Sequence, residues 1–428
     1  MINIKAVKQL DADEKAGSIR FKKSYLYSTG LELRELKIVQ RESDFTNGAE
    51  YRISLDNGKV FGEWTTLEKN LIQNYGDDEM TVNETDRVWN PVHKHFVYTH
   101  FTRYFLGNHK DAYKASWGGE KTYFDHQYIV VTNEKGDTAV SKKLMMYEDG
   151  VDFDPENPRN PDFLYKNIGF LNQPAVMRCG DIIVPVGIPV SVGCRMAGLD
   201  VQRVFPSCPD KVRCVIVARG KFNPGTKEYD FTFSNPVILS DLRSSRGIDE
   251  PIIIELKSGR LLLVMRGANT YIPAWSTRIE PGTPAFKWYS YSDDGGKTFT
   301  EAEPWRFDNR EVIYSPASIS KFVRSAKNGK LYWIGNVTPP TTYGNFPRFP
   351  LNIAEVDETL GILKRDTLTV IDTRREGETD EVQLSNFFVF EDRESGILEL
   401  TLSKIGQFDK SKEGRFFCES WKYEIDFE

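Results

Sequence analysis

A glycine followed by alternating apolar residues recurs four times in the later part of this 428-residue chain. The segments read CGDIIVPVGIP, SGRLLLVMRGA, NGKLYWIGNV and SGILELTLSK, and their glycines are Gly180, Gly259, Gly329 and Gly396. Successive glycines are 79, 70 and 67 residues apart, and a short apolar segment precedes each one. Such a unit predicts two strands joined by a turn. A repeat of this length is typical of folds built from similar units around an axis or along a stack.

A polar residue followed by proline precedes several of these apolar segments: Asn90-Pro91, Gln173-Pro174, Glu250-Pro251 and Ser315-Pro316. Proline as the first residue of a strand costs no ladder hydrogen bond, so these pairs predict strand starts. Less regular segments near residues 23 and 93 bring the total to about six units of about 70 residues. The sequence therefore predicts an all-β fold, a six-bladed β-propeller of four-stranded antiparallel blades, in one domain over residues 1–428. A large β-sandwich and a β-helix are the alternatives.

The segment YSYSDDGGKTFTE at residues 289–301 contains a turn motif. Ser292, Asp294, Gly296, Thr298 and Phe299 fit the pattern S-x-D-x-G-x-T-aromatic. Aspartate accepts hydrogen bonds from nearby backbone amides, and glycine adopts positive φ, so we expect the motif to fold a turn and not to perform chemistry. SLDNGKVF at residue 54 repeats it, and TNEKGDTA at residue 132 is a decayed copy.

This motif is the Asp-box, and together with the propeller-length repeat it makes the chain resemble the sialidase superfamily of six-bladed propellers. The likeness is clearest from about residue 245 to 405. It implies a ligand-binding funnel at the strand starts, where the residues are polar: Asn90, Gln173, Asp249, Glu250, Tyr314, Ser315, Ser385 and Asn386. It also implies that Glu250 is the buried glutamate of the site, and that Arg266 and Arg348 grip a substrate carboxylate. An arginine fork makes paired hydrogen bonds to a carboxylate, which lysine cannot do. The alternative for each arginine is a surface ion pair.

The sequence also departs from this family. Where sialidases carry a tyrosine nucleophile, the segment VQLSNFF has Leu384. A leucine cannot attack an anomeric carbon, and Tyr314, one blade earlier, is the candidate substitute. In the first blade, Arg20 and Arg52 are the candidates for a third arginine, and Arg52 lies beside an Asp-box turn, where a structural role is expected.

All five histidines, His93, His95, His100, His109 and His126, fall within 34 residues. Imidazole titrates near neutral pH, so a histidine in the funnel could serve as general acid or base. His93 follows the Asn90-Pro91 pair, and His126 has Asp125 beside it. The alternatives are satisfied core or surface histidines and a zinc site, but the spacing lacks the paired ligands of structural zinc sites. No metal or cofactor is predicted.

The composition of the chain argues against two classes of partner, nucleic acids and membranes. The formal net charge is -6, and the basic residues are scattered, which argues against nucleic acid. No apolar run approaches the roughly 20 residues of a membrane span, and the N-terminal segment lacks the apolar stretch of a secretory signal. We therefore expect a cytoplasmic protein as the sequence stands, or a periplasmic or secreted one if a signal has been trimmed.

These features predict a carbohydrate-active enzyme, an exo-acting glycoside hydrolase for a terminal acidic or deoxy sugar of an oligosaccharide or glycoconjugate. The alternatives are a lyase that acts on a uronate by β-elimination and a non-catalytic glycan-binding propeller. The candidate catalytic residues are Glu250, Asp249, His93, His126, Asp125 and Tyr314. The candidate substrate-binding residues are Arg266, Arg348, Asn90, Gln173 and Trp275, the last because flat rings pack against sugar faces.

Overall fold

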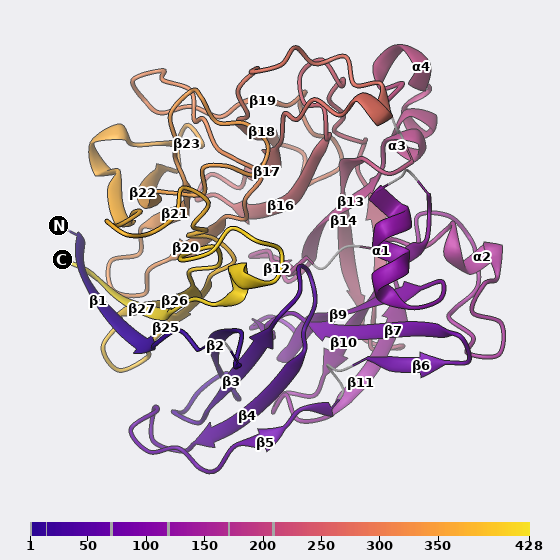
Figure 1. The fold of residues 1–428 in the computed structure, drawn as a ribbon. Helices are drawn as coiled ribbons and strands as arrows, with labels where there is room; N and C mark the ends of the chain where they lie inside the picture. The colour runs from indigo at the N-terminus through magenta and orange to yellow at the C-terminus, as the bar shows by residue number, and fades with distance from the viewer. Residues whose placement is uncertain (1, 14, 69–71, 118–119, 170–171, 208–209) are drawn as a thin grey trace.

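Six antiparallel sheets surround a central axis as the blades of a propeller (Figure 1). The computed structural model describes residues 2–13, 15–68, 72–117, 120–169, 172–207 and 210–428. Four of the sheets have four strands, one has five and one has six. The predicted all-β, six-bladed propeller is therefore confirmed.

The strands follow one another blade by blade along the chain. Blade 1 contains β2 (Ser18–Tyr25), β3 (Leu33–Gln40), β4 (Gly48–Ser54) and β5 (Thr65–Thr66). Blade 2 contains β6 (Gln73–Tyr75), β7 (Asp78–Glu84), β8 (Val88–Asn90), β9 (His95–Phe105), β10 (Tyr123–Thr132) and β11 (Ala139–Leu144). Blade 3 contains β12 (Ala175–Val176), β13 (Ile182–Pro189), β14 (Arg213–Asn223) and β15 (Glu228–Phe233).

The second half of the chain continues in the same way. Blade 4 contains β16 (Ile248–Glu255), β17 (Leu261–Gly267), β18 (Lys287–Ser292) and β19 (Glu303–Pro304). Blade 5 contains β20 (Lys321–Arg324), β21 (Leu331–Asn336), β22 (Leu351–Asp357), β23 (Ile362–Leu363) and β24 (Thr369–Asp372). Blade 6 contains β25 (Phe388–Glu391), β26 (Leu398–Ser403), β27 (Ser420–Phe427) and the N-terminal strand β1 (Ile2–Leu10).

Short helices interrupt this pattern. They are α1 (His109–Trp117), α2 (Pro161–Leu164), α3 (Val190–Ala197) and α4 (Val201–Val204), with the 3-10 turns η2 (Pro273–Trp275), η3 (Arg365–Thr367) and η4 (Gly414–Phe416). No helix within the described residues is both long and apolar enough to cross a membrane.

The repeated glycines occupy one equivalent place in four blades. Gly180, Gly259, Gly329 and Gly396 each lie in the turn between the first and second strands of the unit. Their φ angles are 90°, 91°, 70° and 69°, a region in which a side chain is strained. The period in the sequence therefore arises from one turn geometry repeated around the ring.

Blade 2 makes this turn without glycine, and the prediction that Asn90-Pro91 starts a strand is wrong. Asn90 is the last residue of β8, and its Oδ1 accepts hydrogen bonds from the backbone amides of Val92 and His93 at 3.1 and 3.2 Å. Proline is as well suited to the second position of such a turn as to a strand start. Asn90 and His93 therefore lie in the hairpin between β8 and β9.

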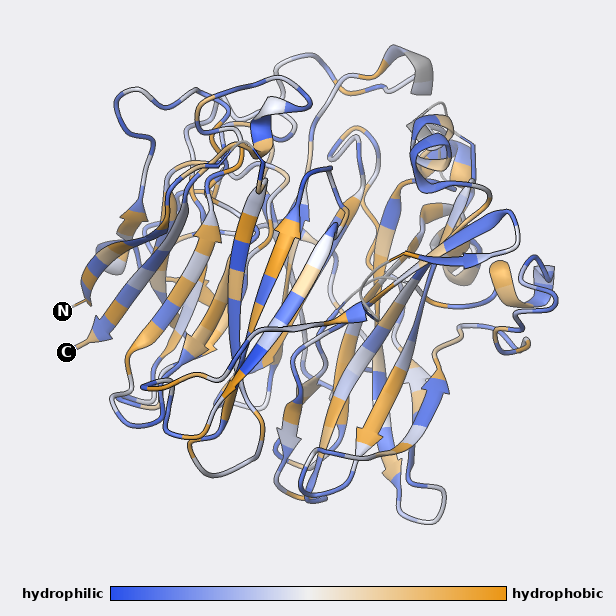
Figure 2. Ribbon diagram, turned by 60° about the horizontal axis from the view of Figure 1, so that its bottom comes forward, coloured by the Kyte–Doolittle hydropathy of each residue, from blue (hydrophilic) through white to orange (hydrophobic). Residues whose placement is uncertain are grey.

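The hydrophobic core lies between adjacent blades. Figure 2 shows the strands side on, with hydrophobic and hydrophilic residues alternating along many of them. Val97 and Ile129 of blade 2, for example, belong to one buried cluster with Val184 and Ile216 of blade 3. Each blade thus buries apolar side chains against its neighbours, as stacked sheets do.

The ring closes through the N-terminal strand. β1 pairs antiparallel with β27 from Ile2, opposite Phe427, to Leu10, opposite Ser420. This pairing covers an edge that would otherwise present unpaired backbone groups.

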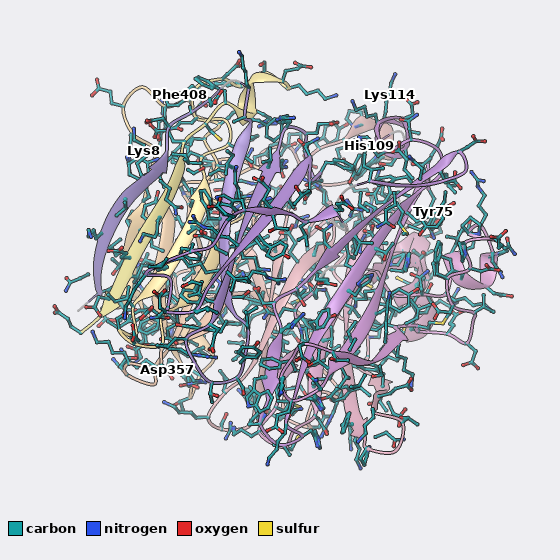
Figure 3. All side chains as sticks on the ribbon, turned by 90° about the horizontal axis from the view of Figure 1, so that it is seen from below. Lys8, Tyr75, His109, Lys114, Asp357 and Phe408 are labelled. Carbon is teal, nitrogen blue, oxygen red and sulfur yellow. The ribbon has the colours of Figure 1, made fainter. Side chains whose placement is uncertain are left out.

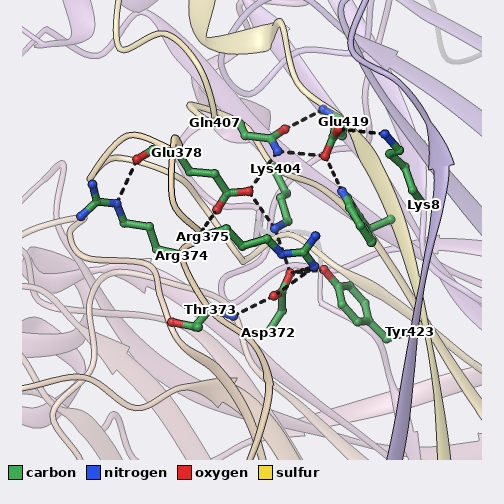
Figure 4. A network of polar contacts seen from close by, with 11 residues as sticks. Lys8, Asp372, Thr373, Arg374, Arg375, Glu378, Lys404, Gln407, Glu419 and Tyr423 are labelled. Carbon is green, nitrogen blue, oxygen red and sulfur yellow. Dashed lines mark hydrogen bonds and ion pairs between the residues drawn. The ribbon is translucent and has the colours of Figure 1, made fainter.

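A buried polar network lies beside this closure (Figure 4). Lys404 is fully buried, and its Nζ lies 2.9 Å from Oδ2 of Asp372 and 2.9 Å from Oε1 of Glu378. Lys8 on β1 reaches Glu419 of the same network at 3.2 Å. The buried ammonium of Lys404 is thus neutralised by nearby carboxylates, as a buried charge requires. The network joins the end of blade 5 to blade 6 and, through Lys8, to the closing strand.

The two S-x-D-x-G segments form the same hydrogen-bonded turn. Oδ1 of Asp294 accepts hydrogen bonds from the amides of Lys297 and Thr298 at 3.0 Å each, and Ser292 Oγ accepts one from the amide of Gly296 at 2.9 Å. In the first segment, Asp56 likewise accepts a hydrogen bond from the amide of Val60 at 2.9 Å. These aspartates are engaged in folding their turns.

Candidate active site

A central cavity of about 520 Å³ opens where the loops between the second and third strands of the blades converge. The described residues of these loops in the first five blades are 41–47, 106–117 with 120–122, 190–207 with 210–212, 268–286 and 337–350, and α1 and α3 lie within two of the loops. Innermost strands supply further lining residues, such as Arg20 on β2 and Asp249 on β16. The cavity therefore lies at the axis and receives side chains from around the ring.

Glu250 and Arg266 meet in this cavity. Oε1 of Glu250 lies 2.9 Å from Nη1 of Arg266, and Oδ2 of Asp249 lies 3.6 Å from Nη2. Burial lowers the pKa of Arg266, but the carboxylates of Glu250 and Asp249 outweigh burial and raise it. A register shift between Asp249 and Ile252 bends β16 here, and Glu250 has a φ of 45°. The sequence prediction thus located Asp249, Glu250 and Arg266 together at the cavity wall.

Arg348 and the first-blade candidate Arg20 also line the cavity, and the structure adds Arg246. Arg348 donates hydrogen bonds to Gln383 Oε1 at 2.6 Å and to the carbonyl of Ala317 at 2.5 Å. Burial lowers the pKa of each of the three arginines to about 10, which leaves them cationic at neutral pH. Within the described part of the chain, none of the three forms an ion pair with a carboxylate.

The other first-blade candidate, Arg52, has a structural role. Its guanidinium pairs with Glu35 and lies 4.2 Å from the ring centre of Phe61 and 4.4 Å from that of Trp64. Arg20, and not Arg52, therefore brings the first blade's positive charge to the cavity.

The lining of the central cavity carries excess positive charge. Seven basic side chains line it: Arg20, Arg103, Lys211, Arg213, Arg246, Arg266 and Arg348. Three acidic side chains, Asp44, Asp249 and Glu250, line it as well, and Asp125 pairs with two of the arginines from behind. Counting each basic side chain as +1 and each carboxyl group as −1, the formal charge is +3, so the cavity favours an anionic ligand.

Asp125 holds two of these arginines in place. Its carboxylate receives two hydrogen bonds from Arg103, at 2.6 and 2.8 Å, and one from Arg213 at 3.1 Å. Burial raises the pKa of Asp125, but the two arginines lower it further, so the group stays ionised. Arg103 also donates to the hydroxyl of Tyr113 at 2.5 Å. Asp125 is therefore a fixed counter-ion and not a free acid or base.

Asp44 differs from the other carboxylates of the cavity. It is exposed, has a φ of 58°, and forms no hydrogen bond or ion pair through its side chain with any described residue. Its loop is anchored by Phe45, whose ring stacks on His109 at a centroid distance of 4.2 Å. Nδ1 of His109 lies 2.7 Å from Oε2 of Glu79. His109, which Figure 3 shows on the same side of the molecule as Lys114 and Tyr75, thus supports the loop from behind the cavity.

His93 lies far from the cavity. It is in the turn before β9, whereas Arg103 near the other end of β9 lines the cavity. Eight residues from His95 to Arg103 span about 26 Å of strand. The ring of His93 instead packs against that of Phe222, with the ring centroids 4.8 Å apart. Nδ2 of Asn90 donates hydrogen bonds to the carbonyl of Gly180 and to Oη of Tyr229. The prediction that Asn90 and His93 belong to the funnel is therefore wrong.

His126 faces away from its neighbour Asp125, because successive residues of β10 point to opposite faces. Its ring packs against Phe163 at 4.7 Å and Phe153 at 5.8 Å. Burial lowers the pKa of His126 to about 3. The described residues that line the central cavity include no histidine.

The remaining predicted residues divide between cavity and surroundings. Trp275 lines the cavity, with Nζ of Lys211 5.5 Å from its ring centre. Gln173 is exposed, and Tyr314 packs against Phe286 at 5.2 Å, and neither lines the cavity. Leu384 is fully buried in the core between blades 5 and 6.

The segment of Leu384 still reaches the cavity through Asn386. Asn386 lines the cavity with a φ of 56°, and its carbonyl accepts a hydrogen bond from Arg20 at 3.2 Å. Its side chain is an amide, which is no nucleophile. The tyrosines of the cavity are Tyr113 and Tyr123, and burial raises the pKa of both, that of Tyr113 to about 12. Their phenols therefore stay protonated at neutral pH.

A buried lysine lies beside the arginine cluster. Lys287 is 1% exposed and donates a hydrogen bond to the carbonyl of Ser318 at 2.5 Å. Burial lowers its pKa to about 7, with Glu250 opposing and Arg266 and Arg348 adding to the shift. No residue pattern in the sequence distinguished this lysine. Across the described ranges, no group of three or more His, Cys, Asp or Glu side chains is arranged to hold a metal ion.

Comparison with known proteins shows the fold. No protein-family model and no curated protein sequence matches the chain. A protein of unknown function from Dyadobacter fermentans is similar over 99% of both chains, with a TM-score of 0.56 and 11% identity. A Hadza microbial sialidase is similar over 98% of this chain and 68% of its own, with a TM-score of 0.53 and 11% identity.

An intramolecular trans-sialidase from Ruminococcus gnavus is similar over 97% of this chain and 96% of its own, with a TM-score of 0.51 and 11% identity. The chain thus has a six-bladed propeller fold like that of this sialidase and trans-sialidase, at 11% sequence identity to each.

Proposed function

We propose that the protein is a glycoside hydrolase that binds a terminal acidic sugar in the central cavity. The observation that carries the proposal is that Arg20, Arg246 and Arg348 face the cavity with no carboxylate partner among the described side chains. A sugar carboxylate would supply that partner, because a guanidinium binds a carboxylate through paired hydrogen bonds. Two neighbours in fold are named as a sialidase and a trans-sialidase, which supports a carbohydrate ligand.

Glycoside hydrolysis commonly uses two carboxyl groups in different protonation states. Glu250 lies 2.9 Å from Arg266, and we assign it the negative charge that attacks or stabilises the anomeric centre. Asp44 lines the cavity, is exposed, and has no ion-pair partner among the described residues. We assign it the proton transfer to the leaving oxygen.

The lining also favours an exo-acting enzyme. Side chains from around the whole ring enclose one central cavity, and a cavity of this shape suits the end of an oligosaccharide. A chain bound along its length would need a groove that runs between two opposite walls. No observation favours β-elimination, since the described cavity lining offers no histidine base and Tyr113 has a pKa of about 12.

The test is incubation with oligosaccharides that end in different acidic sugars, including sialic and uronic acids. We expect new reducing ends without the ultraviolet absorbance of an unsaturated product. Arg348→Ala should lower the rate roughly tenfold to a hundredfold, because a hydrogen bond to a charged group contributes about 1.5–3 kcal/mol. Arg260→Ala, which removes an arginine paired with Asp293 outside the cavity, should not. Binding without product would indicate a glycan-binding protein instead, and rising absorbance would indicate a lyase.

A further inference from the structure

Among the described residues, only neutral groups hold the guanidinium of Arg20 in the central cavity. Its Nη1 donates a hydrogen bond to the carbonyl of Asn386 at 3.2 Å, and its Nη2 donates one to Oε1 of Gln40 at 3.3 Å. Its Cζ lies 5.4 Å from the ring centre of Phe388. These contacts restrain the guanidinium without supplying a negative charge, so the positive charge of Arg20 stays available to a ligand.

The aromatic ring distinguishes Arg20 from the other two arginines of the cavity that lack a carboxylate partner. Arg348 donates a hydrogen bond to Oε1 of Gln383 at 2.6 Å, and Arg246 donates one to Oδ1 of Asn345 at 3.2 Å. The face of an aromatic ring attracts a cation through its quadrupole, most strongly where water is excluded. The ring therefore gives Arg20 a contact that differs in kind from these hydrogen bonds.

Phe388 stands near the propeller axis but outside the cavity. It lies on β25, the innermost strand of blade 6, and Arg20 lies on β2, the innermost strand of blade 1. Phe388 is partly buried and is not among the described residues that line the central cavity, whereas Arg20 is. A change at this neutral ring therefore reaches a bound ligand through the residues that do line the cavity.

One short segment provides two of the three contacts of Arg20. Asn386, whose carbonyl accepts the hydrogen bond, is two residues before Phe388 and has a φ of 56°. Such a conformation persists only where the surrounding structure enforces it. The bend before β25 thus presents a carbonyl and a ring to the same guanidinium.

Two lysines also lie near the ring of Phe388. Nζ of Lys22 is 5.4 Å from the ring centre, and Nζ of Lys321 is 5.9 Å from it. Asp86 lies 2.8 Å from Lys22, so this carboxylate pairs with a lysine and not with Arg20. Three cations near one another repel, and the attraction of the ring for each of them opposes that repulsion. The ring therefore keeps Arg20 in place beside two other positive charges.

We propose that Phe388 is a positioning residue that keeps the guanidinium of Arg20 directed at the carboxylate of the substrate. The inference rests on the proposed function, in which Arg20 is one of the arginines that bind this carboxylate. Each Nη of Arg20 carries two N–H groups and donates one of them to the protein, which leaves the other for a ligand. Without the ring, the guanidinium would adopt more orientations and bind a carboxylate less tightly.

The test compares an acidic sugar with the same molecule without its charge. The probes are free N-acetylneuraminic acid and its methyl ester, or the matching pair for another acidic sugar that the substrate screen identifies. Neither free sugar has a glycosidic bond to hydrolyse, so dissociation constants can be measured by ligand-observed NMR titration without turnover. Phe388→Leu should weaken binding of the acid about tenfold, or about 1.4 kcal/mol, which is within the range of a partly desolvated cation–π contact. Binding of the ester should not change.

Two further variants serve as controls. Phe388→Tyr keeps the ring and should bind the acid as wild type does. Phe390→Leu removes a ring two residues further along β25, which has Nζ of Lys23 5.8 Å from its centre and does not line the cavity, and it should also bind as wild type does. Urea unfolding shows whether each variant is folded under the assay conditions. Phe388→Met, which also lacks the ring, replaces Phe388→Leu if that variant unfolds.

A double-mutant cycle separates an effect through Arg20 from a general effect on the structure. Arg20→Ala alone should weaken binding of the acid roughly tenfold to a hundredfold, because it removes hydrogen bonds to a charged group. Adding Phe388→Leu to Arg20→Ala should weaken binding no further. An effect transmitted by Lys22 or Lys321 would persist in the Arg20→Ala background.

Three results would overturn the inference while leaving the proposed function intact. The first is unchanged binding of the acid by a folded variant without the ring. The second is equal weakening of the acid and its ester, and the third is equal weakening of the acid with and without Arg20. If wild type binds no acidic sugar of the screen, the proposed function itself is contradicted, and the inference about Phe388 fails with it.

Discussion

Nη1 of Arg266 lies 2.9 Å from Oε1 of Glu250, at the point where an irregularity in β16 holds Glu250 in the left-handed region with a φ of 45°. Residues with side chains rarely adopt this conformation. Strain of this kind persists only where the surrounding structure enforces it, and it concentrates at functional sites. Asn386 and Asp44, which also line the cavity, have positive φ as well.

Arg266→Ala should abolish hydrolysis of an acidic sugar. It removes the cation that holds Glu250, and breaking this partly buried pair should lower the free energy of unfolding by less than the roughly 3–5 kcal/mol of a fully buried pair. Activity is measured together with urea unfolding, to show that the variant is folded under the assay conditions. Arg324→Ala is the control, since Arg324 pairs with Glu358 outside the cavity. Full activity in folded Arg266→Ala would refute the assignment of Glu250.

Lys287→Met should stabilise the protein most at and below neutral pH. The folded-state pKa of Lys287 is about 7, against an ordinary value of 10.5, so the unfolded chain binds the extra proton between these limits. The resulting penalty is complete below about pH 7 and disappears as the pH rises toward 10.5. From about pH 7 to pH 9, the variant's advantage in unfolding free energy should shrink by about 2 kcal/mol. Urea titrations across that range measure it, and a constant advantage would contradict the lowered pKa.

His126→Phe should leave activity unchanged and improve acid stability. The folded-state pKa of His126 is about 3 and the ordinary value is 6.5, so wild type loses stability as the pH falls through this interval. Near pH 5 the variant should be spared a loss of about 2 kcal/mol. Chemical unfolding at several pH values provides the measurement. Lost activity in a folded variant would restore His126 as a catalytic candidate.

Asp294→Ala should destabilise the protein without affecting its chemistry. Asp294 accepts hydrogen bonds from two backbone amides and from the hydroxyls of Ser292 and Thr298. Allowing for solvent screening, we expect a loss of about 1 kcal/mol. Asp293→Ala is a control one residue away, because Asp293 contacts only Arg260 among the described side chains. Melting temperatures distinguish the two, and equal effects would mean that the turn contributes no specific stability.

The fold was predictable because its repeat has one physical origin. Gly180, Gly259, Gly329 and Gly396 share a turn that requires positive φ, and this requirement marks four of the six blades in the sequence. The hairpin at Asn90 uses a side-chain-capped turn instead, and the same Asn-Pro pair suits a strand start equally well.

The site was predictable where charges interrupt an apolar strand and where a segment resembles the sialidase family. Asp249, Glu250 and Arg266 stand out in the first way, Arg348 was predicted in the second, and all four line the cavity. Arg20 is only one of two first-blade candidates in the sequence, because β2 reads SIRFKKSY and no pattern shows which of its three basic residues faces the cavity. Its place near the start of an innermost strand, like that of Asp249, was the available signal. Asp44 lies in a loop, and its position depends on packing against His109 that no local pattern shows.

The lining of the central cavity includes Arg20, Arg103, Arg213, Arg266 and Arg348 from blades 1 to 5, and Asn386 from the segment leading into blade 6. A ligand that contacts several of these residues would hold their blades together. Separation of any one of these blades from the ring would break some of its contacts and release it. A ligand that binds only the folded state raises stability by mass action. Thermal-shift screening of acidic sugars would therefore register binding from the melting of the whole propeller, before any catalytic assay exists.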